Sequence, residues 1–231
     1  MEKMCKYFKL NQQYIYRSLM LILGIVISAL GMTLLIKSDL GQSTISGISN
    51  NIGIITNMKT GTVLAVINYV CFIGQIVLLR HDFKLMQIVQ LIVTSVFGYI
   101  VNLFLYDIGI IANLQLSNYG LKCLVLFVGI VFMAYGVSLM IIANLTFMPF
   151  EGLCNVIALK LHRQFGTIRR YVDIFFVILS LGIIIIFKIP NTNVREGTII
   201  YTLVFGTLTN VFMKSINGLK LKIEKNCINQ N

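Results

Sequence analysis

The sequence predicts an all-α membrane protein with six transmembrane helices in two inverted three-helix repeats, each with a broken or re-entrant short helix. Three observations lead to this fold class. Hydrophobic residues make up 57% of the 231-residue chain, charged residues make up 12%, and the mean hydropathy is +0.86. Six charge-free runs alternate with charged loops, and one stretch of the chain occurs twice. A soluble protein of this length needs more charge to cover its surface.

The duplicated stretch covers residues 24–53 and 129–158, which align at a constant offset of 105 with 11 identities in 30 positions. Chance matches between apolar segments explain the shared Ile, Leu and Val, but not the shared glycines, asparagine and helix break. The pairs of this kind include Gly24/Gly129, Gly31/Gly136, Gly47/Gly152 and Asn50/Asn155. Internal repeats in membrane proteins are typical of transporters.

The six charge-free runs are 18–36, 60–79, 85–106, 123–150, 174–187 and 197–213. The fourth run exceeds one span because it includes a break at Asn144. The fifth is too short unless its helix begins before Asp173, because about 20 residues are needed to cross a bilayer. The first run is long enough to span and has an internal copy, so we interpret it as a transmembrane helix and not as a signal peptide.

The distribution of Lys and Arg predicts a membrane protein with both termini in the cytoplasm. With six spans, 14 of these residues fall on the side of the N-terminus and five on the other side, and cytoplasmic loops retain positive charge. Each repeat holds three spans, so the second repeat enters the membrane in the opposite sense. We expect basic tails at 1–17 and 216–231 around one membrane domain, 18–215, with repeat one at about 18–107 and repeat two at about 121–215.

Small residues predict a close crossing of the first and fourth spans. Gly24, Ser28 and Gly31 share one face of the first span, and Gly129 and Gly136 share the equivalent face of the fourth. Such residues let helix backbones approach closely in a membrane.

Each helix break is followed by a segment too short to cross the membrane, at 43–56 and 149–160. Segments of this length suit re-entrant half-helices, and Pro149 suits a first helical position because its missing N–H costs nothing there. Two ordinary surface helices are the alternative interpretation.

Three acidic residues at predicted membrane depth are candidate substrate contacts, because ionisable groups are expensive there. Asp39 lies at the first helix break, Glu151 lies near the start of the second short segment, and Asp173 lies about one turn into the fifth span. Arg169 precedes Asp173 by four residues, so the two can pair on one helix face. Asn155, which matches Asn50 in the repeat, adds a fifth candidate.

Each acidic candidate also has a structural interpretation. Asp39 is equally suited to a turn, and Glu151 to the positive N-terminus of a helix. Asp173 can form a structural ion pair with Arg169 or Arg170. Asparagines such as Asn155 more often hydrogen-bond between helices than contact a ligand.

The remaining residues favour neither catalysis nor metal binding. The five cysteines have no C-x-x-C spacing, and the two histidines, His81 and His162, lie in predicted loops. No nucleophile, zinc or nucleotide-binding motif is present. The net charge of +11 comes from short basic runs beside apolar segments, where the lipid bilayer is the expected partner and nucleic acid is not. We expect no enzyme activity, cofactor or metal.

The pattern of functional candidates is similar to a known family. It consists of Asp39-Leu40-Gly41, a second copy with Pro149 and Glu151, then Gly166, Arg169 and Asp173, and Gly197-Thr198 before Gly206. Over roughly residues 18–215 this pattern resembles the YczE branch of the YitT/YczE-like bacterial integral membrane proteins. The resemblance implies a small polytopic protein of the bacterial plasma membrane. The chain departs from the family pattern at 43–46, where Ser-Thr-Ile-Ser replaces proline-aromatic-acid, and at Glu151, which replaces Asp.

Together these observations predict a small secondary transporter or exporter of a small molecule, with a midplane site between inverted repeats. The alternatives are a substrate-capture subunit of a larger transport complex and an accessory membrane protein without transport activity. The sequence leaves the substrate and the oligomeric state open.

Overall fold

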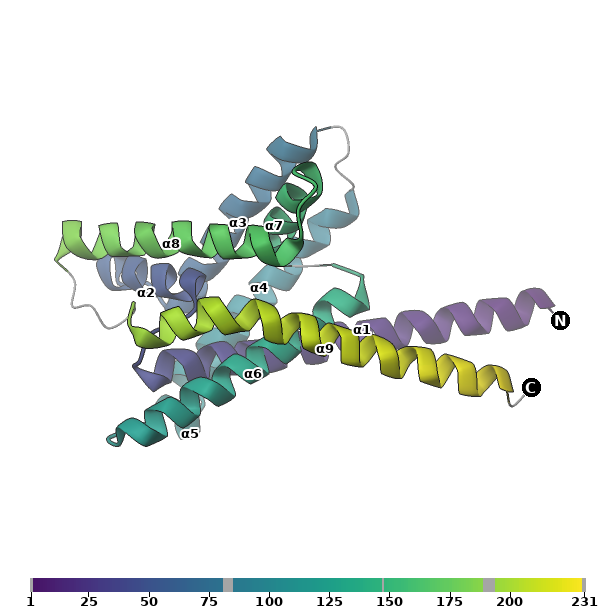
Figure 1. Ribbon diagram of the computed structural model, residues 1–231, viewed down its shortest axis with the longest axis horizontal. Coiled ribbons are helices and arrows are strands. Elements are labelled where there is room, and N and C mark those ends of the chain that lie inside the picture. Colours follow the sequence, from purple (N-terminus) through teal and green to yellow (C-terminus); the bar gives the residue numbers. More distant parts are fainter. Residues whose placement is uncertain (1, 81–84, 147, 189–193, 230–231) are drawn as a thin grey trace.

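The computed structural model describes residues 2–80, 85–146, 148–188 and 194–229, which are helical with no strand (Figure 1). His81 lies outside the described residues. The helices are α1 (Glu2–Ser38), α2 (Thr44–Thr56), α3 (Thr60–Leu79), η2 (Leu85–Ile88), α4 (Val89–Asn102), η3 (Leu103–Asp107), α5 (Gly109–Ala112), α6 (Tyr119–Ala143), α7 (Pro149–Lys160), α8 (Phe165–Phe187) and α9 (Glu196–Asn229).

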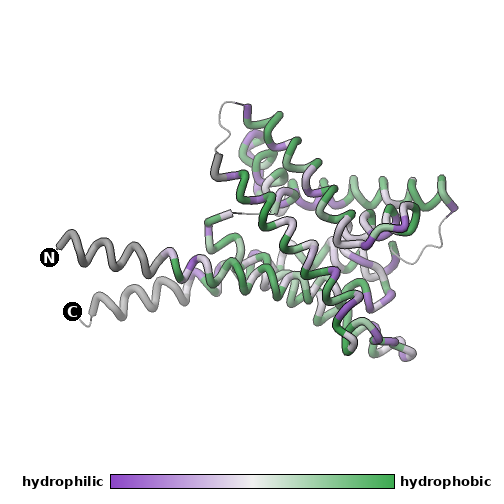
Figure 2. The backbone as a smooth tube through the Cα atoms, turned by 180° about the vertical axis from the view of Figure 1, so that it is seen from behind, coloured by the Kyte–Doolittle hydropathy of each residue, from purple (hydrophilic) through white to green (hydrophobic). Residues whose placement is uncertain are grey.

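Six of the described helices are long and apolar enough to cross a membrane, which confirms the predicted number of spans. The fourth run does include a break, because α6 stops at Ala143 and Asn144 adopts a left-handed conformation with φ 49°. The fifth span does begin before Asp173, since α8 starts at Phe165. Large apolar side chains are exposed on each of these six helices, as the surface of a multi-pass membrane protein requires. The backbone tube is largely coloured hydrophobic along the long helices (Figure 2).

The backbone repeats at the offset seen in the sequence. The long helices α1 and α6 end at Ser38 and Ala143, and the short helices α2 and α7 begin at Thr44 and Pro149. Left-handed residues recur at the same offset, at Asp39 and Asn144 and again at Asn57 and His162. A left-handed residue ends a helix in both places, so the two halves break and resume at matching positions.

Helix packing also repeats when the halves are exchanged. The long helices α1 and α6 pack on each other; α1 also packs on α4, as α6 packs on α9. The short helix of each half packs on the other half, α7 against α3 and α2 against α8. The interface between the halves therefore contains both short helices.

Glycine backbones form the predicted close crossing of α1 and α6. A Cβ added at Gly24 would lie 2.8 Å from the carbonyl oxygen of Gly136, and one at Gly136 would lie 2.6 Å from the Ser28 nitrogen. Gly31 lies equally close to the backbone of α6 at Gly129 and Met133. No side chain fits at these contacts, so the small residues determine the spacing of the two helices.

Both short helices are inserted into the bundle. The first six residues of α2 are all buried, and so are the first four of α7. A surface helix would bury only one face, so the surface-helix alternative is wrong. Ser43 caps α2 by accepting a hydrogen bond from the Ser46 N–H, and Pro149 opens α7 as expected.

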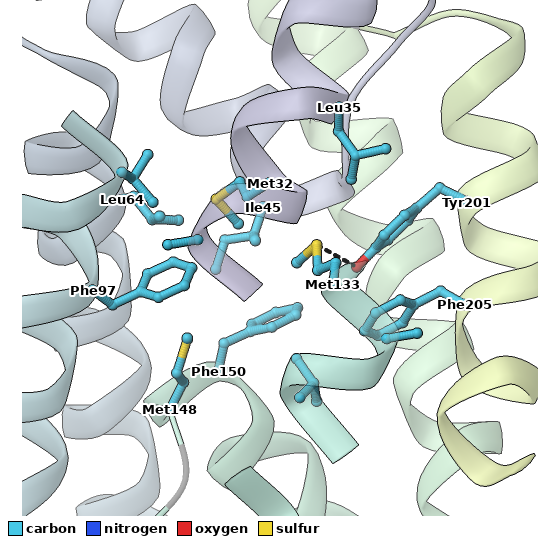
Figure 3. Packing of buried hydrophobic residues seen from close by; sticks show 14 of the residues in the cluster. Met32, Leu35, Ile45, Leu64, Phe97, Met133, Met148, Phe150, Tyr201 and Phe205 are labelled. Atoms are coloured by element: carbon cyan, nitrogen blue, oxygen red, sulfur yellow. Dashed lines mark hydrogen bonds between the residues drawn. The ribbon is translucent and has the colours of Figure 1, made fainter. Parts of the chain in front are cut away.

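The core lies where the short helices meet the long ones (Figure 3). Phe150 of α7 is 1% exposed. Around it in the same cluster are Met32, Ile45, Leu64, Phe97, Met133, Tyr201 and Phe205. These side chains come from both halves, so the core itself joins the repeats.

Candidate functional site

Three buried charged side chains of α7 and α8 form one ion network. Arg169 donates from Nη1 to Glu151 Oε1 at 2.8 Å, and from Nε to both carboxylate oxygens of Asp173 at 3.2 and 3.1 Å. The Arg169 and Asp173 side chains are 3% exposed and the Glu151 side chain is 9% exposed. Two carboxylates around one guanidinium leave one negative charge uncompensated in the interior, which costs free energy unless it has a function.

Aromatic rings hold the guanidinium in place. Its central carbon lies 4.3 Å from the centroid of the Phe150 ring and 5.4 Å from that of Phe205, within the range of cation–π attraction. Phe205 in turn stacks on Tyr201 with 4.7 Å between centroids, and the Tyr201 hydroxyl donates to Met133 Sδ at 3.7 Å (Figure 3). Arg169 is therefore positioned by charge and by packing.

A hydrogen bond connects the network to the first half of the chain. Thr44, the first residue of α2, donates from its hydroxyl to Asp173 Oδ1 at 2.6 Å. A second contact runs between the halves in the opposite direction. Asn68 on α3 of the first half accepts a hydrogen bond of 3.2 Å from the Phe150 N–H in the first turn of α7. Asn68 and Asp173 match at the offset of 105, so each half holds the start of the other half's short helix.

Two spaces of different character adjoin the network. A polar cavity of about 120 Å³ lies between α8 and α9, and its lining includes Arg169, Arg170 and Asp173. The apolar chamber beside Glu151, lined by Phe150 and Met133 among others, measures about 10 Å³. A space of that size holds about one water molecule. Of these two spaces, the α8–α9 cavity is the one with room for a small ligand.

The crossing of α3 and α4 in the first half, which corresponds to the crossing of α8 and α9, is closed. A Cβ at Gly98 on α4 would lie 2.6 Å from the carbonyl oxygen of Gly61 on α3, and Asn102 Oδ1 accepts a hydrogen bond of 2.9 Å from the Gly61 N–H. At the α8–α9 crossing the equivalent glycines are Gly166 and Gly206. A Cβ at Gly206 would meet no atom within 4 Å, so this crossing is open.

The other two predicted site residues lie apart from the ion network. Just after the end of α1, Asp39 forms an ion pair of 2.9 Å with Lys122, and the Asp39 side chain is 49% exposed. The Asp39 carbonyl also accepts a hydrogen bond of 3.1 Å from Arg195 Nη1. Asn155 is half-buried one turn beyond Glu151 on α7. The structure thus brings together Glu151, Arg169 and Asp173 but neither Asp39 nor Asn155.

Several residues of the site were not predicted as such. Thr44 lies in the stretch 43–46, where the chain departs from the family pattern, although its position at the start of a short segment was a usable signal. Thr202 and Thr207 line the polar cavity from α9, and nothing in their local sequence distinguishes them. Among the described residues, no three His, Cys, Asp or Glu side chains gather as a metal site would require.

The family follows from the sequence between residues 15 and 214, which matches the model of a family of unknown function, DUF6198. The chain belongs to the DUF6198 family. No curated protein and no solved structure matches it. The DUF6198 match includes both short helices and the whole ion network, so the site described above lies inside the shared region.

Proposed function

We propose that this DUF6198 protein is a small secondary transporter whose substrate site lies at the bilayer midplane between two inverted repeats. The observation that supports this proposal is the unequal state of two matching helix crossings, closed at Gly61 and Gly98 and open at Gly166 and Gly206. Inverted repeats that adopt different conformations around one site are the basis of alternating access. The buried ion network lies where such a site is expected.

The proposed cycle exchanges the states of the two crossings. In the state described, the polar cavity leads from the start of α8 to Arg169 and Asp173. The opposite state closes Gly166 against Gly206 and opens the α3–α4 crossing, which leads toward Asn68. Arg169, Glu151 and Asp173 stay between the two openings in both states. The cargo passes unmodified, so the proposal includes no catalysis and no cofactor.

The orientation in the membrane is part of the proposal. Basic residues gather around the start of α8, namely Lys160, Arg163, Arg169 and Arg170. Because cytoplasmic ends retain positive charge, we assign this end and the open cavity to the cytoplasmic half of the bilayer. The N-terminal part of α1 and the C-terminal part of α9 lie on one side of the molecule, as six spans require (Figure 1). We also propose, from the resemblance of the sequence pattern, the bacterial plasma membrane as its location and a relationship to the YczE branch.

The exchange of states is testable with two matched cysteine reporters. Thr94 and Thr202 correspond at an offset of 108; Thr94 is buried beside the closed crossing, and Thr202 lines the open cavity. In a cysteine-free background, Thr202→Cys should react with a membrane-impermeant maleimide from the cytoplasmic side, and Thr94→Cys should react slowly from either side.

A wedge in the closed crossing then tests whether the two crossings are coupled. Gly98→Ala adds a Cβ against the Gly61 carbonyl oxygen, so it should increase labelling at residue 94 from outside and decrease labelling at residue 202. Gly182→Ala is the control, because a Cβ there meets no atom within 4 Å. If Gly98→Ala leaves labelling at residue 202 unchanged, the crossings are independent and the transporter proposal is wrong.

A further inference from the structure

We infer that the polar cavity between α8 and α9 is a binding site for a small monovalent anion of the carboxylate class. As the identity of a transported substrate, this inference rests on the proposed function. As a binding site, it is argued from the cavity alone. It adds residues of α9 and Arg170 to the predicted set of substrate contacts.

The first step of the argument is a guanidinium nitrogen without a partner. Arg169 uses Nε and Nη1 for Asp173 and Glu151, and Nη2 is buried with no hydrogen-bond partner among the described residues. A buried, unpaired donor on a charged group is costly. Arg169 lines the polar cavity, so the inference is that an acceptor bound in the cavity reaches Nη2 and removes this cost.

The second step is the inventory of donors and acceptors around the cavity. Arg170, Thr207 and Asn210 line it and can donate hydrogen bonds, whereas the Thr202 hydroxyl already donates to the Thr198 carbonyl at 2.8 Å. Asp173 is the acidic residue of the lining, and both of its carboxylate oxygens accept hydrogen bonds from Arg169, one of them also from Thr44. Glu151 belongs to the lining of the apolar chamber on the other side of Arg169. The cavity therefore offers the donors of Arg170, Thr207 and Asn210 beside a carboxylate that is already engaged by Arg169 and Thr44, which favours an anion over a cation.

The third step is size and charge. A cavity of about 120 Å³ is slightly smaller than the roughly 150 Å³ that accommodates benzene, so it suits a molecule such as acetate. The buried network of Arg169, Asp173 and Glu151 has one more negative than positive charge. The exposed Arg170 in the cavity lining offsets that charge, so the network and the lining arginine together are neutral before a ligand binds. Each further charge brought to membrane depth is costly, so a monovalent anion is favoured over a divalent one.

The test uses sodium acetate as the probe and purified full-length protein in detergent, with binding measured by isothermal titration calorimetry. Gly206→Leu places a side chain into the cavity and should abolish acetate binding. Gly182→Leu is the matched control, since a Cβ at either glycine meets no atom within 4 Å, and it should bind like the unmodified protein. Arg170→Gln should weaken binding about tenfold through loss of a charge-assisted hydrogen bond.

Three results would overturn the inference. One is equal acetate affinity in Gly206→Leu and Gly182→Leu. Another is binding of methylammonium or sulfate that is tighter than acetate binding and is lost in Gly206→Leu. The third is loss of acetate binding in nanodiscs that contain phosphatidylglycerol but not in those of phosphatidylcholine, because a lipid headgroup would then be the anion that occupies the cavity.

Failure of this inference and failure of the transporter proposal are distinguishable. If acetate binds but Gly98→Ala does not change labelling at residues 94 and 202 in opposite directions, the anion site is supported and the transporter proposal is wrong. If labelling at the two residues changes in opposite directions but acetate does not bind, the transporter proposal is supported and the anion site is wrong.

Discussion

Asp173 accepts a hydrogen bond of 2.6 Å from the hydroxyl of Thr44, and these two residues belong to different halves of the chain. The contact joins the buried ion network to the start of α2. Because Asn68 holds the start of α7 in the same way, the two halves are interlocked by one pair of equivalent contacts. The acceptor is the carboxylate of Asp173 in one contact and the neutral amide of Asn68 in the other. The two halves are therefore chemically unequal at their interface.

Replacing Thr44 tests the importance of this contact. Thr44→Val keeps the shape of the side chain but removes the only hydroxyl donor that is shown for Asp173. We expect a loss of about 1–3 kcal/mol in unfolding free energy, because a buried carboxylate loses a partner. Thermal unfolding in detergent measures the effect. Thr56→Val on the same helix is the control, since its hydroxyl bonds only the Ile52 carbonyl and is exposed; equal losses in both variants would contradict the prediction.

The three network residues should differ in their effect on stability. Asp173→Asn leaves Arg169 paired with Glu151 and should cost about 1–3 kcal/mol. Arg169→Gln leaves two buried carboxylates without a cation and should cost about 3–5 kcal/mol. Arg170→Gln should stay within about 0.5 kcal/mol of the unmodified protein, because Arg170 is exposed.

Thermal unfolding of the three variants in one detergent decides their order. A larger loss for Asp173→Asn than for Arg169→Gln would show that charge compensation does not govern this site. Asp173→Cys lines the same cavity as Thr202→Cys, so it should react with an impermeant reagent from the cytoplasmic side no faster than Thr202→Cys. A much faster reaction would show that residue 173 lies in a loop.

The glycine crossing predicts which helix positions tolerate bulk. Gly31→Leu and Gly136→Leu push a side chain into the backbone of the facing helix, so each should reduce folded yield in detergent. Overpacking typically costs about 1–3 kcal/mol. Gly74→Leu should reduce the yield less, because a Cβ at Gly74 lies 3.4 Å from the nearest atom, the end of the Leu153 side chain. Equal yields for all three variants would contradict this account of the crossing.

Membrane orientation is testable at the start of α6. Residues 37–59 and 107–122 should face outward, and both termini should face the cytoplasm, because basic residues are concentrated on the terminal side. A cysteine at exposed Asn118, in a background without the exposed Cys123, should react with an impermeant maleimide added outside intact cells. Reaction only after access to the cytoplasmic side would exclude the inverted arrangement.

The sequence was sufficient for the elements and for part of the site. Helix number, the breaks at Asp39 and Asn144, and the pairing of Arg169 with Asp173 depend on local patterns, namely charge-free length, the shared break and a spacing of four residues. Each of these signals depends only on residues close together in the sequence, and helix geometry alone relates them. The structure confirms these predictions because they do not depend on how separate helices pack.

The rest of the site depends on packing between helices. Glu151 joins Arg169 because α7 lies against α8, and no spacing rule relates residues on two separate helices. Asp39 had the same local features as a site residue, yet it lies in a turn and pairs with Lys122, which was the alternative interpretation. The open and closed crossings have equivalent glycines, so the difference between them is absent from the sequence pattern.

The α1–α6 crossing also limits how the protein is able to move. Sliding α1 along α6 by one turn would bring Ile27 or Leu35 to the place of Gly31, where no Cβ fits. The two long helices therefore cannot work as a piston. Instead, α1 and α6 stay fixed against each other along their axes. The short helices and α3, α4, α8 and α9 rearrange by rotation around this fixed pair.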